Sequence, residues 1–132
     1  MVIAGPGVQD GVVSDALVSH MDLAATFLEY GSTPKPAEMD SRSLKGLLEG
    51  KTKKHRDAVR SGLGAWRMVY DGRYKLIRGF DPEASSQNLH KGASAAKAVA
   101  PLLFDLKDDP LENVNMAAKA SQHVERLSRY LA

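Results

Sequence analysis

The chain has 132 residues, which is enough for one small domain, or for one domain and part of another. Its 18 Lys and Arg residues nearly balance its 16 Asp and Glu residues, and the basic positions are scattered, so the composition argues against a nucleic-acid partner. The absence of cysteine excludes disulfides, thiolate metal sites and cysteine nucleophiles, and no apolar run approaches the roughly 20 residues of a membrane span.

The first four residues are a continuous apolar run that stops at Gly5-Pro6-Gly7. Such a run is typical of a strand buried on both faces of a parallel sheet. A buried strand needs neighbours, and no other run of this kind follows. The pattern therefore predicts that residues 1–4 are a strand of a larger sheet, and that the chain starts inside a larger domain.

A helix is predicted to follow and to end at Gly31. Ser19 is placed to cap it, and Asp22 lies three residues further on, as in an acidic capping box. The prolines of the 32–36 segment cannot continue the helix, because each lacks a backbone N–H and clashes with the preceding turn. We therefore predict a domain boundary here, which assigns residues 1–35 to one domain and 36–132 to another.

A short helical turn is predicted over residues 44–49, closed by Gly50. The basic run 51–56 that follows has two interpretations. The favoured one is a solvated loop, and the alternative is a docking patch for an anionic ligand.

Two β-prone runs, residues 66–70 and 73–78, are joined by Asp71-Gly72. Asp-Gly between such runs predicts a hairpin with a two-residue turn, in which Tyr70 faces Arg73. About half of the side chains on each face of this hairpin are apolar. In a sheet with one solvent-exposed face, apolar and polar residues alternate more regularly along each strand. The hairpin is therefore predicted to be covered on both sides, once by the C-terminal helix and once by a segment outside this chain.

Two further strands are predicted at residues 58–61 and 102–107, with a linker over 80–101. Asp109, Pro110 and Glu112 match the first positions of a helix, and a last helix is predicted from about Ser121 to Leu131. The fold class is thus α+β: a small antiparallel sheet of about four strands with a C-terminal helix packed on it, preceded by a strand and a helix that would belong to an α/β domain.

Residues that could carry chemistry are few. His20 and Asp22 lie two apart and do not share a helical face, so a joint metal site is disfavoured. For the carboxylates of Asp105, Asp108 and Asp109, capping and turn formation are favoured over a calcium loop. The remaining histidines lie in polar surroundings and are expected at the surface; they are His55, His90 and His123. The spacing of these residues along the sequence therefore predicts no catalytic residue and no metal ligand.

Several segments, in order along nearly the whole chain, resemble the late part of type I sulfatases. They are Gly5-Pro6-Gly7-Val8; the run from Val18 to Leu28; Asp40-Ser41-Arg42-Ser43-Leu44; Trp66-Arg67-Met68-Val69; Gly72-Arg73-Tyr74-Lys75-Leu76-Ile77; Leu103-Phe104-Asp105-Leu106; Asp108-Asp109-Pro110-Leu111-Glu112; and Asn115-Met116-Ala117. The sequence departs from the family where Ala25 replaces a usual proline and Phe104 a common tyrosine. The resemblance implies that residues 1–35 are the last strand and helix of the catalytic domain and that 36–132 are the C-terminal subdomain.

The family hydrolyses sulfate esters or sulfamates with a formylglycine, made from Cys or Ser in a Cys/Ser-x-Pro-x-Arg motif, and with one calcium ion. Neither cofactor can be placed here: there is no cysteine, and the run that begins at Ser32 ends in Pro36 rather than Arg. The resemblance therefore implies a fragment without catalytic residues or metal ligands, whose partners are the rest of the catalytic domain and, in the parent enzyme, a sulfated substrate. If residues of this chain contact that substrate, the prediction is His20, Arg67 and Arg73, because sulfated ligands attract cations.

Two other functions stay open at this point. The chain could be a non-catalytic structural or binding module that acts with a partner subunit, or the tail of a related phosphonate or phosphate monoester hydrolase. Sulfatases of this kind are often periplasmic or secreted, and the start of this sequence has no signal-peptide pattern.

Overall fold

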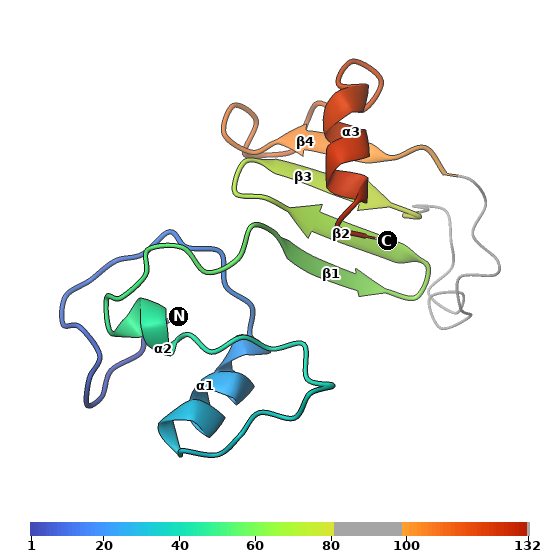
Figure 1. Cartoon of the computed structure of the whole chain (residues 1–132). Helices are drawn as coiled ribbons and strands as arrows, with labels where there is room; N and C mark the ends of the chain where they lie inside the picture. Colours follow the sequence, from blue (N-terminus) through green and yellow to red (C-terminus); the bar gives the residue numbers. More distant parts are fainter. Residues whose placement is uncertain (81–98, 132) are drawn as a thin grey trace. The chain divides into compact units, whose positions relative to one another are not determined.

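The computed structural model describes residues 1–80 and 99–131, and the chain divides into two compact units, Met1–Asp57 and Ala58–Ala132 (Figure 1). In chain order the elements are α1 (Asp22–Tyr30), α2 (Lys45–Leu48), β1 (Val59–Leu63), β2 (Trp66–Tyr70), β3 (Tyr74–Arg78), β4 (Leu102–Asp105) and α3 (Ser121–Ser128). The predicted α+β class is confirmed, with a four-stranded antiparallel sheet and a C-terminal helix. Most of the predicted linker at 80–101, with His90, lies outside the described residues.

The N-terminal unit is organised around α1. The Asp22 carboxylate accepts the backbone N–H of Ser19 at 2.9 Å, which is one half of the predicted capping box. Gly31 is the C-cap as predicted, and Ser32, at φ 54°, takes the left-handed conformation next to it. Thr26 Oγ1 accepts the backbone N–H of Leu44 at 2.9 Å, so the segment that leads into α2 is fastened to α1.

Residues 1–4 form no strand in this structure, contrary to the prediction. The side chains of Met1 and Val2 are 69% and 95% exposed. A strand exists only beside a hydrogen-bonding partner, and the described N-terminal unit contains no other strand to pair with. The assignment of residues 1–35 and 36–132 to two domains of a larger enzyme stays a prediction.

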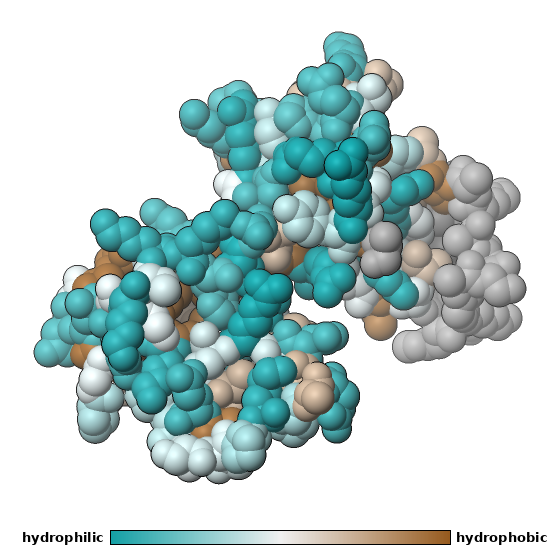
Figure 2. All heavy atoms as spheres, viewed as in Figure 1, coloured by the Kyte–Doolittle hydropathy of each residue, from teal (hydrophilic) through white to brown (hydrophobic). Residues whose placement is uncertain are grey.

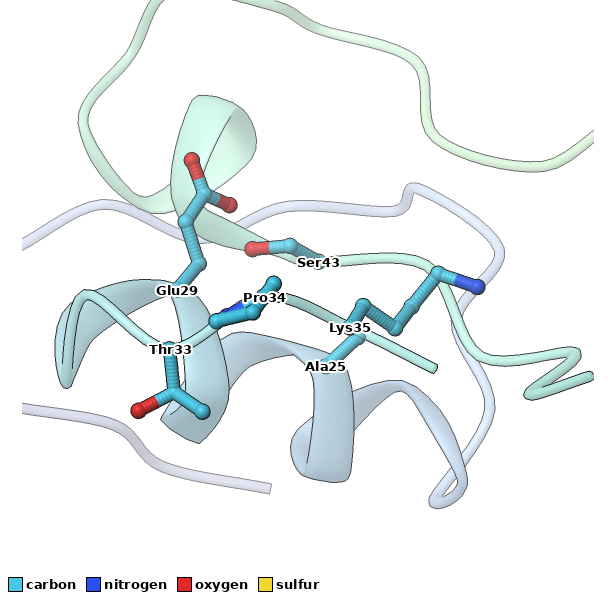
Figure 3. A pocket seen from close by; sticks show the side chains of 6 residues that line it. All are labelled: Ala25, Glu29, Thr33, Pro34, Lys35 and Ser43. Carbon is cyan, nitrogen blue, oxygen red and sulfur yellow. The ribbon is translucent and has the colours of Figure 1, made fainter. Parts of the chain in front are cut away.

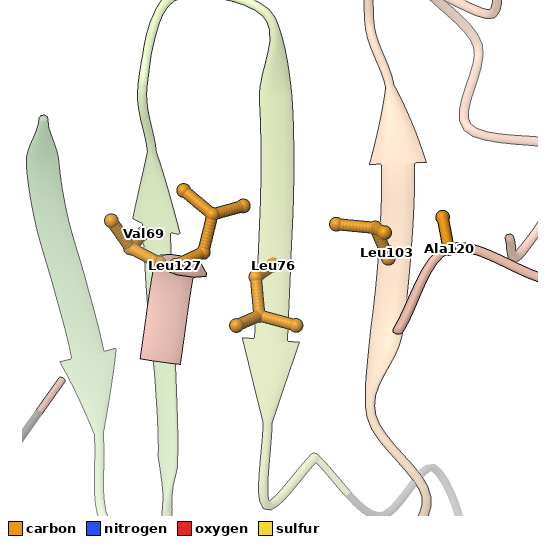
Figure 4. Close-up of a cluster of buried hydrophobic side chains, with 5 residues drawn as sticks. All are labelled: Val69, Leu76, Leu103, Ala120 and Leu127. Carbon is orange, nitrogen blue, oxygen red and sulfur yellow. The ribbon is translucent and has the colours of Figure 1, made fainter. Parts of the chain in front are cut away.

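The C-terminal unit is a sheet in the order β1-β2-β3-β4, with α3 packed on one face. Val69, Leu76 and Leu103 are cross-strand partners in one row, and all three are fully buried. Leu127 from α3 and Ala120 just before it complete the cluster (Figure 4). Alternation along each strand brings one side chain in two to this face, and the 3.6-residue period of α3 brings Val124 and Leu127 onto it.

The register of the β2–β3 hairpin differs from the prediction. Tyr70 pairs with Lys75 instead of facing Arg73, because the two-residue turn is Gly72-Arg73 rather than Asp71-Gly72. Asp71 Oδ1 accepts the backbone N–H groups of Arg73 and Tyr74 at 3.0 and 2.7 Å, which makes Asp71 the flanking residue of the turn. Gly72, at φ 98°, then occupies the first central position, where a type II′ turn needs glycine.

The second face of the sheet is also apolar. It carries half-buried or buried side chains from β2, β3 and β4, namely Met68, Tyr70, Ile77, Leu102 and Phe104. Among the described elements of this unit, α3 is the one helix, and it lies on the opposite face. That this second face is covered by a segment outside the chain stays a prediction.

The helix predicted at Asp109 does not form, and the described chain between β4 and α3 is made of turns. The Asp109 carboxylate accepts the backbone N–H of Val114 at 2.8 Å, so it closes a turn instead of capping a helix. Glu112 has φ 59°, outside the helical region, and its carboxylate binds Lys75 Nζ on β3 at 2.7 Å. This tertiary ion pair replaces the local capping interaction.

Gly79 ends the β3 strand in a conformation that a side chain would strain. Its φ is +71°, and a Cβ there would lie 2.4 Å from the Ala65 carbonyl oxygen. Gly79→Ala should lower the free energy of unfolding by about 3 kcal/mol, through both the left-handed conformation and the contact with backbone. Gly11→Ala is the matched control, because Gly11 has φ +67° and open space around its Cβ position, and it should cost about 1 kcal/mol. Urea denaturation of both variants measures the difference, and equal losses would contradict the close approach to Ala65.

Candidate functional site

A buried ion cluster joins the start of α1 to the end of the N-terminal unit. Asp22 is fully buried, and its carboxylate accepts hydrogen bonds from both Arg56 Nε, at 2.7 Å, and Arg56 Nη2. His55 Nε2 lies 3.1 Å from Asp22 Oδ2, and the backbone N–H of Arg42 donates to Oδ1 at 3.0 Å. With the Ser19 N–H, this carboxylate is bound from every side.

The electrostatics of the cluster explain how a carboxylate can be buried there. Burial alone would raise the pKa of Asp22, but the hydrogen bonds from Arg56, Arg42 and Ser19 together hold that pKa well below its usual range. The same pair raises the pKa of the Arg56 guanidinium. Because every lone pair of the Asp22 carboxylate is engaged, it is suited to fastening segments together and not to proton transfer or metal binding.

This cluster corrects two sequence-based expectations. His55 was expected at the surface, yet its side chain is only 8% exposed. The basic run 51–56 is a solvated loop in its first part, where Lys51 and Lys54 form exposed ion pairs, and its last two residues turn inward to Asp22. Asp22 and Arg56 are 34 positions apart, and no local pattern in the sequence links them.

A second cluster holds Arg73, one of the three predicted substrate contacts. Arg73 Nε and Nη2 bind the Asp105 carboxylate at 3.0 and 2.6 Å, and Nη2 also contacts Asp108 at 3.2 Å. The hydrogen bonds from Arg73 lower the pKa of Asp105, and Asp105 raises the pKa of the Arg73 guanidinium. The charge of Arg73 is thus balanced within the chain. A contact with substrate at this residue stays a prediction.

The other two predicted substrate contacts lie in different places. His20 is exposed in the turn before α1, in the N-terminal unit. Arg67 is on β2, directly opposite Arg78 on β3, at the end of the hairpin away from the turn that holds Arg73. The structure therefore does not bring Arg67 and Arg73 together, and their roles stay predictions.

Arg67 and Arg78 line a pocket of about 310 Å³ in the C-terminal unit. Its other lining residues are Ala65, Gly79, Ser128 and Leu131. Arg67 Nη1 donates to the carbonyl oxygens of Gly64 and Trp66 at 2.7 and 2.9 Å. On the face of the molecule that Figure 2 shows, hydrophilic side chains dominate the surface of the C-terminal unit.

Two hollows lie in the N-terminal unit. One, of about 360 Å³, is lined by Ala25, Glu29, Thr33, Pro34, Lys35 and Ser43 (Figure 3). In this view the carboxylate of Glu29 points up and the amino group of Lys35 points to the right, so they do not face each other, and Lys35 donates to the Met39 carbonyl oxygen. The other hollow, of about 400 Å³, is lined mainly by apolar side chains from residues 1–18 and by Leu44, Leu47 and Leu48. The second hollow is lined by no charged side chain.

The described residues contain no group of three His, Asp or Glu side chains that could hold a metal ion. Asp105 and Asp108 bind Arg73, and Asp109 closes its turn, so the interpretation of these carboxylates as turn-forming residues agrees with the structure. His123 was expected at the surface, but its ring stacks on Tyr74 with centroids 4.1 Å apart. None of the helices within residues 1–80 and 99–131 is long and apolar enough to cross a membrane.

Comparisons with known proteins identify relatives of the whole chain. The family described as N-sulphoglucosamine sulphohydrolase, C-terminal, matches residues 1–131. The ulvan-active sulfatase of Formosa agariphila is 31% identical over 134 residues, which cover 84% of this chain and 27% of that protein. Arylsulfatase K of Xenopus laevis is 28% identical over 99% of this chain and 24% of its own length. The chain thus spans about a quarter of the length of the curated relatives it matches.

Solved structures agree with this relationship. A 2-O GAG sulfatase is 26% identical, with a TM-score of 0.72, over 97% of this chain and 27% of that chain. A phosphonate monoester hydrolase from Silicibacter pomeroyi, at 22% identity and a TM-score of 0.74 over 97% of this chain and 27% of that one, shares the fold. The sheet and its terminal helix are thus those of the alkaline phosphatase-like sulfatases. The chain belongs to the family of N-sulphoglucosamine sulphohydrolase C-terminal domains, and the sequence-based resemblance to sulfatases is confirmed.

Proposed function

We propose that this chain is the C-terminal part of a sulfuric ester hydrolase, in which it supplies scaffold and a rim of the substrate cleft. The observation that carries the proposal is the family match over residues 1–131, combined with a span of only about a quarter of the sulfatases it matches. The nucleophile and the metal ligands then lie in the part of the enzyme outside these 132 residues.

The chemistry of the described residues supports the proposal that this chain supplies scaffold and not the reactive groups. Cleavage of a sulfate ester needs groups that stabilise charge on the transferred group and on the leaving oxygen. The two most buried carboxylates, Asp22 and Asp105, are each bound by an arginine, and so they are already neutralised. The described residues do not fit the calcium ion of the family, and the formylglycine motif has no match in this sequence. Both groups are therefore proposed for the rest of the enzyme.

Two apolar surfaces support a covering partner. One is the sheet face that carries Met68, Tyr70 and Ile77. The other is the hollow of about 400 Å³ beside α2, and Figure 2 shows hydrophobic atoms at the surface of this part of the N-terminal unit. Contiguous apolar surface of this kind marks an interaction site. The remainder of the catalytic domain is the partner that the family membership implies.

We further propose a sulfated polysaccharide as the substrate class, since the relatives include an ulvan-active sulfatase and a 2-O GAG sulfatase. His20, Arg67 and Arg73 are the proposed substrate contacts. The alternative of a phosphonate monoester hydrolase is supported only by a similar fold, because the solved structure of that enzyme is 22% identical to this chain. In the alternative of a non-catalytic binding module, the partner is a separate subunit. In the main proposal, the partner is the rest of the catalytic domain.

The DNA upstream of the Met1 codon tests the proposal. An in-frame Cys/Ser-x-Pro-x-Arg motif is the expected result. A short upstream reading frame of unrelated composition would contradict the sulfatase proposal and favour the binding module. Greater similarity of the upstream segment to phosphonate monoester hydrolases than to sulfatases would favour the other enzyme.

A further inference from the structure

Two arginines face each other across the β2–β3 pairing. Arg67 and Arg78 are direct cross-strand partners, and strand alternation places both on the face that also carries Val69 and Leu76. Like charges directly opposite each other in an antiparallel sheet destabilise it. Positions that depart from such a local rule are expected at functional or strained sites.

Neither of these guanidinium groups has a carboxylate partner among the described residues. Arg67 uses Nη1 for the carbonyl oxygens of Gly64 and Trp66. Arg78 Nη1 donates to Ser128 Oγ at 3.3 Å, and the Ser128 hydroxyl donates its own hydrogen to the Val124 carbonyl oxygen at 2.7 Å. Four other arginines of the chain do bind carboxylates, and these are Arg56, Arg73, Arg126 and Arg129. The pair at 67 and 78 is therefore left with unused N–H donors.

Two glycines let neighbouring atoms pack closely beside the pair. Gly62 on β1 pairs with Arg67, and a Cβ at Gly62 would lie 2.9 Å from Arg67 Cδ. Gly79 brings the backbone against Ala65, and both residues line the same pocket of about 310 Å³. Leu131 adds an apolar wall. Both arginines therefore line one small pocket, with Arg67 held on the side of the β1–β2 turn and Arg78 on the side of α3.

Guanidinium groups recognise tetrahedral oxyanions, because their planar fork matches two oxygens of a sulfate or phosphate group. An anion between Arg67 and Arg78 would also remove the repulsion between them. We propose that this pocket is a binding site for a sulfate group of a sulfated saccharide, with Arg67 and Arg78 as the two ligands. The choice of sulfate over phosphate rests on the proposed function.

The test is the affinity of the 132-residue chain for a fluorescent, sulfated disaccharide, followed by fluorescence anisotropy. Arg78→Gln is the main variant, because the one contact of its guanidinium within the described chain is Ser128 Oγ. Arg67→Gln is the second variant. Arg129→Gln is the matched control, since it removes one positive charge from an exposed i,i+4 pair in which Arg129 is the C-cap residue of α3. Far-UV circular dichroism confirms that each variant keeps its fold.

The expected result is saturable binding that falls about tenfold or more in Arg78→Gln and Arg67→Gln and less than about twofold in Arg129→Gln. Arg78→Lys should restore part of the affinity, because it keeps the charge but not the fork. The desulfated disaccharide should not bind, and the same sugar carrying phosphate should bind more weakly than the sulfated one. Equal losses in all three Gln variants, or binding of the desulfated sugar, would overturn the site.

Binding of the phosphorylated sugar in preference to the sulfated one would overturn the sulfate assignment. Because the readout is binding, a failure here is separate from a failure of the proposed hydrolase function. That function is tested by the upstream sequence, which does not depend on Arg67 or Arg78.

Discussion

Asp22→Asn should lower the free energy of unfolding of the N-terminal unit by about 3 kcal/mol. The substitution keeps the size of the side chain but removes the charge that neutralises Arg56, whose side chain is only 13% exposed. Breaking a buried pair by removing one partner is strongly destabilising, because the other charge stays buried without compensation. Hydrogen exchange at the backbone N–H groups of Arg42 and Leu44 measures the loss, since both N–H groups bind side chains of α1.

Asp57→Asn is the matched control. It removes a carboxylate from an exposed ion pair, in which the side chains of Lys54 and Asp57 are 76% and 62% exposed, and it should leave the stability nearly unchanged. Similar effects of Asp22→Asn and Asp57→Asn would show that the buried cluster does not hold the unit together.

The same cluster should make the chain sensitive to acid. The pKa of Asp22 is lowered in the folded state, so its stabilisation is fully present above the ordinary pKa of 3.8 and is lost as the pH falls through and below that value. Urea denaturation of the native chain should therefore shift to lower urea between about pH 5 and pH 2, and this shift should be smaller in Asp22→Asn. An equal shift in both proteins would assign the acid sensitivity to other carboxylates.

Leu76→Ala should lower the free energy of unfolding of the C-terminal unit by about 3 kcal/mol. Leu76 is fully buried between Val69 and Leu103 on the sheet and faces α3, so its loss removes apolar contacts and leaves a cavity. Trp66, the one tryptophan of the chain, lies on β2 and reports the unfolding of this unit by fluorescence in urea.

Leu111→Ala serves as the control for this substitution. Leu111 is 80% exposed, so the same chemical change there should cost less than about 0.5 kcal/mol. If Leu76→Ala cost no more than Leu111→Ala, the described core would not be the one that stabilises the sheet.

Much of the fold could be predicted, because its signals are local. The β-prone runs on both sides of Asp71-Gly72 gave the hairpin, and the apolar spacing of Val124 and Leu127 gave α3. The predicted pairing of β2 with β3 was wrong, because the turn lies one residue further along the chain than expected. The position of the turn is set by hydrogen bonds from two backbone N–H groups to the Asp71 side chain. The helix predicted at Asp109 failed for a related reason, since Glu112 binds Lys75 from a distant strand.

The charged clusters could be predicted from the sequence only in part. Asp22 was recognised as a capping residue, and the structure shows that role, but its main partner is Arg56. Nothing in the local pattern distinguishes Arg56 from the lysines of the same basic run. In the same way Arg67, Arg73 and Arg78 read alike in sequence, and only tertiary structure shows that Arg73 binds carboxylates while Arg67 and Arg78 face each other. The family was predicted from the resemblance of several segments to sulfatases, and not from the spacing of candidate catalytic residues.

The central claim is that this chain carries scaffold while the reactive groups of a sulfatase lie elsewhere. The most direct measurement is hydrolysis of a chromogenic aryl sulfate by the purified chain, with calcium present, beside a full-length sulfatase as the positive control. We predict that the chain alone releases product no faster than buffer, and that the full-length sulfatase turns over. Enzyme-like turnover by the chain alone would contradict the account.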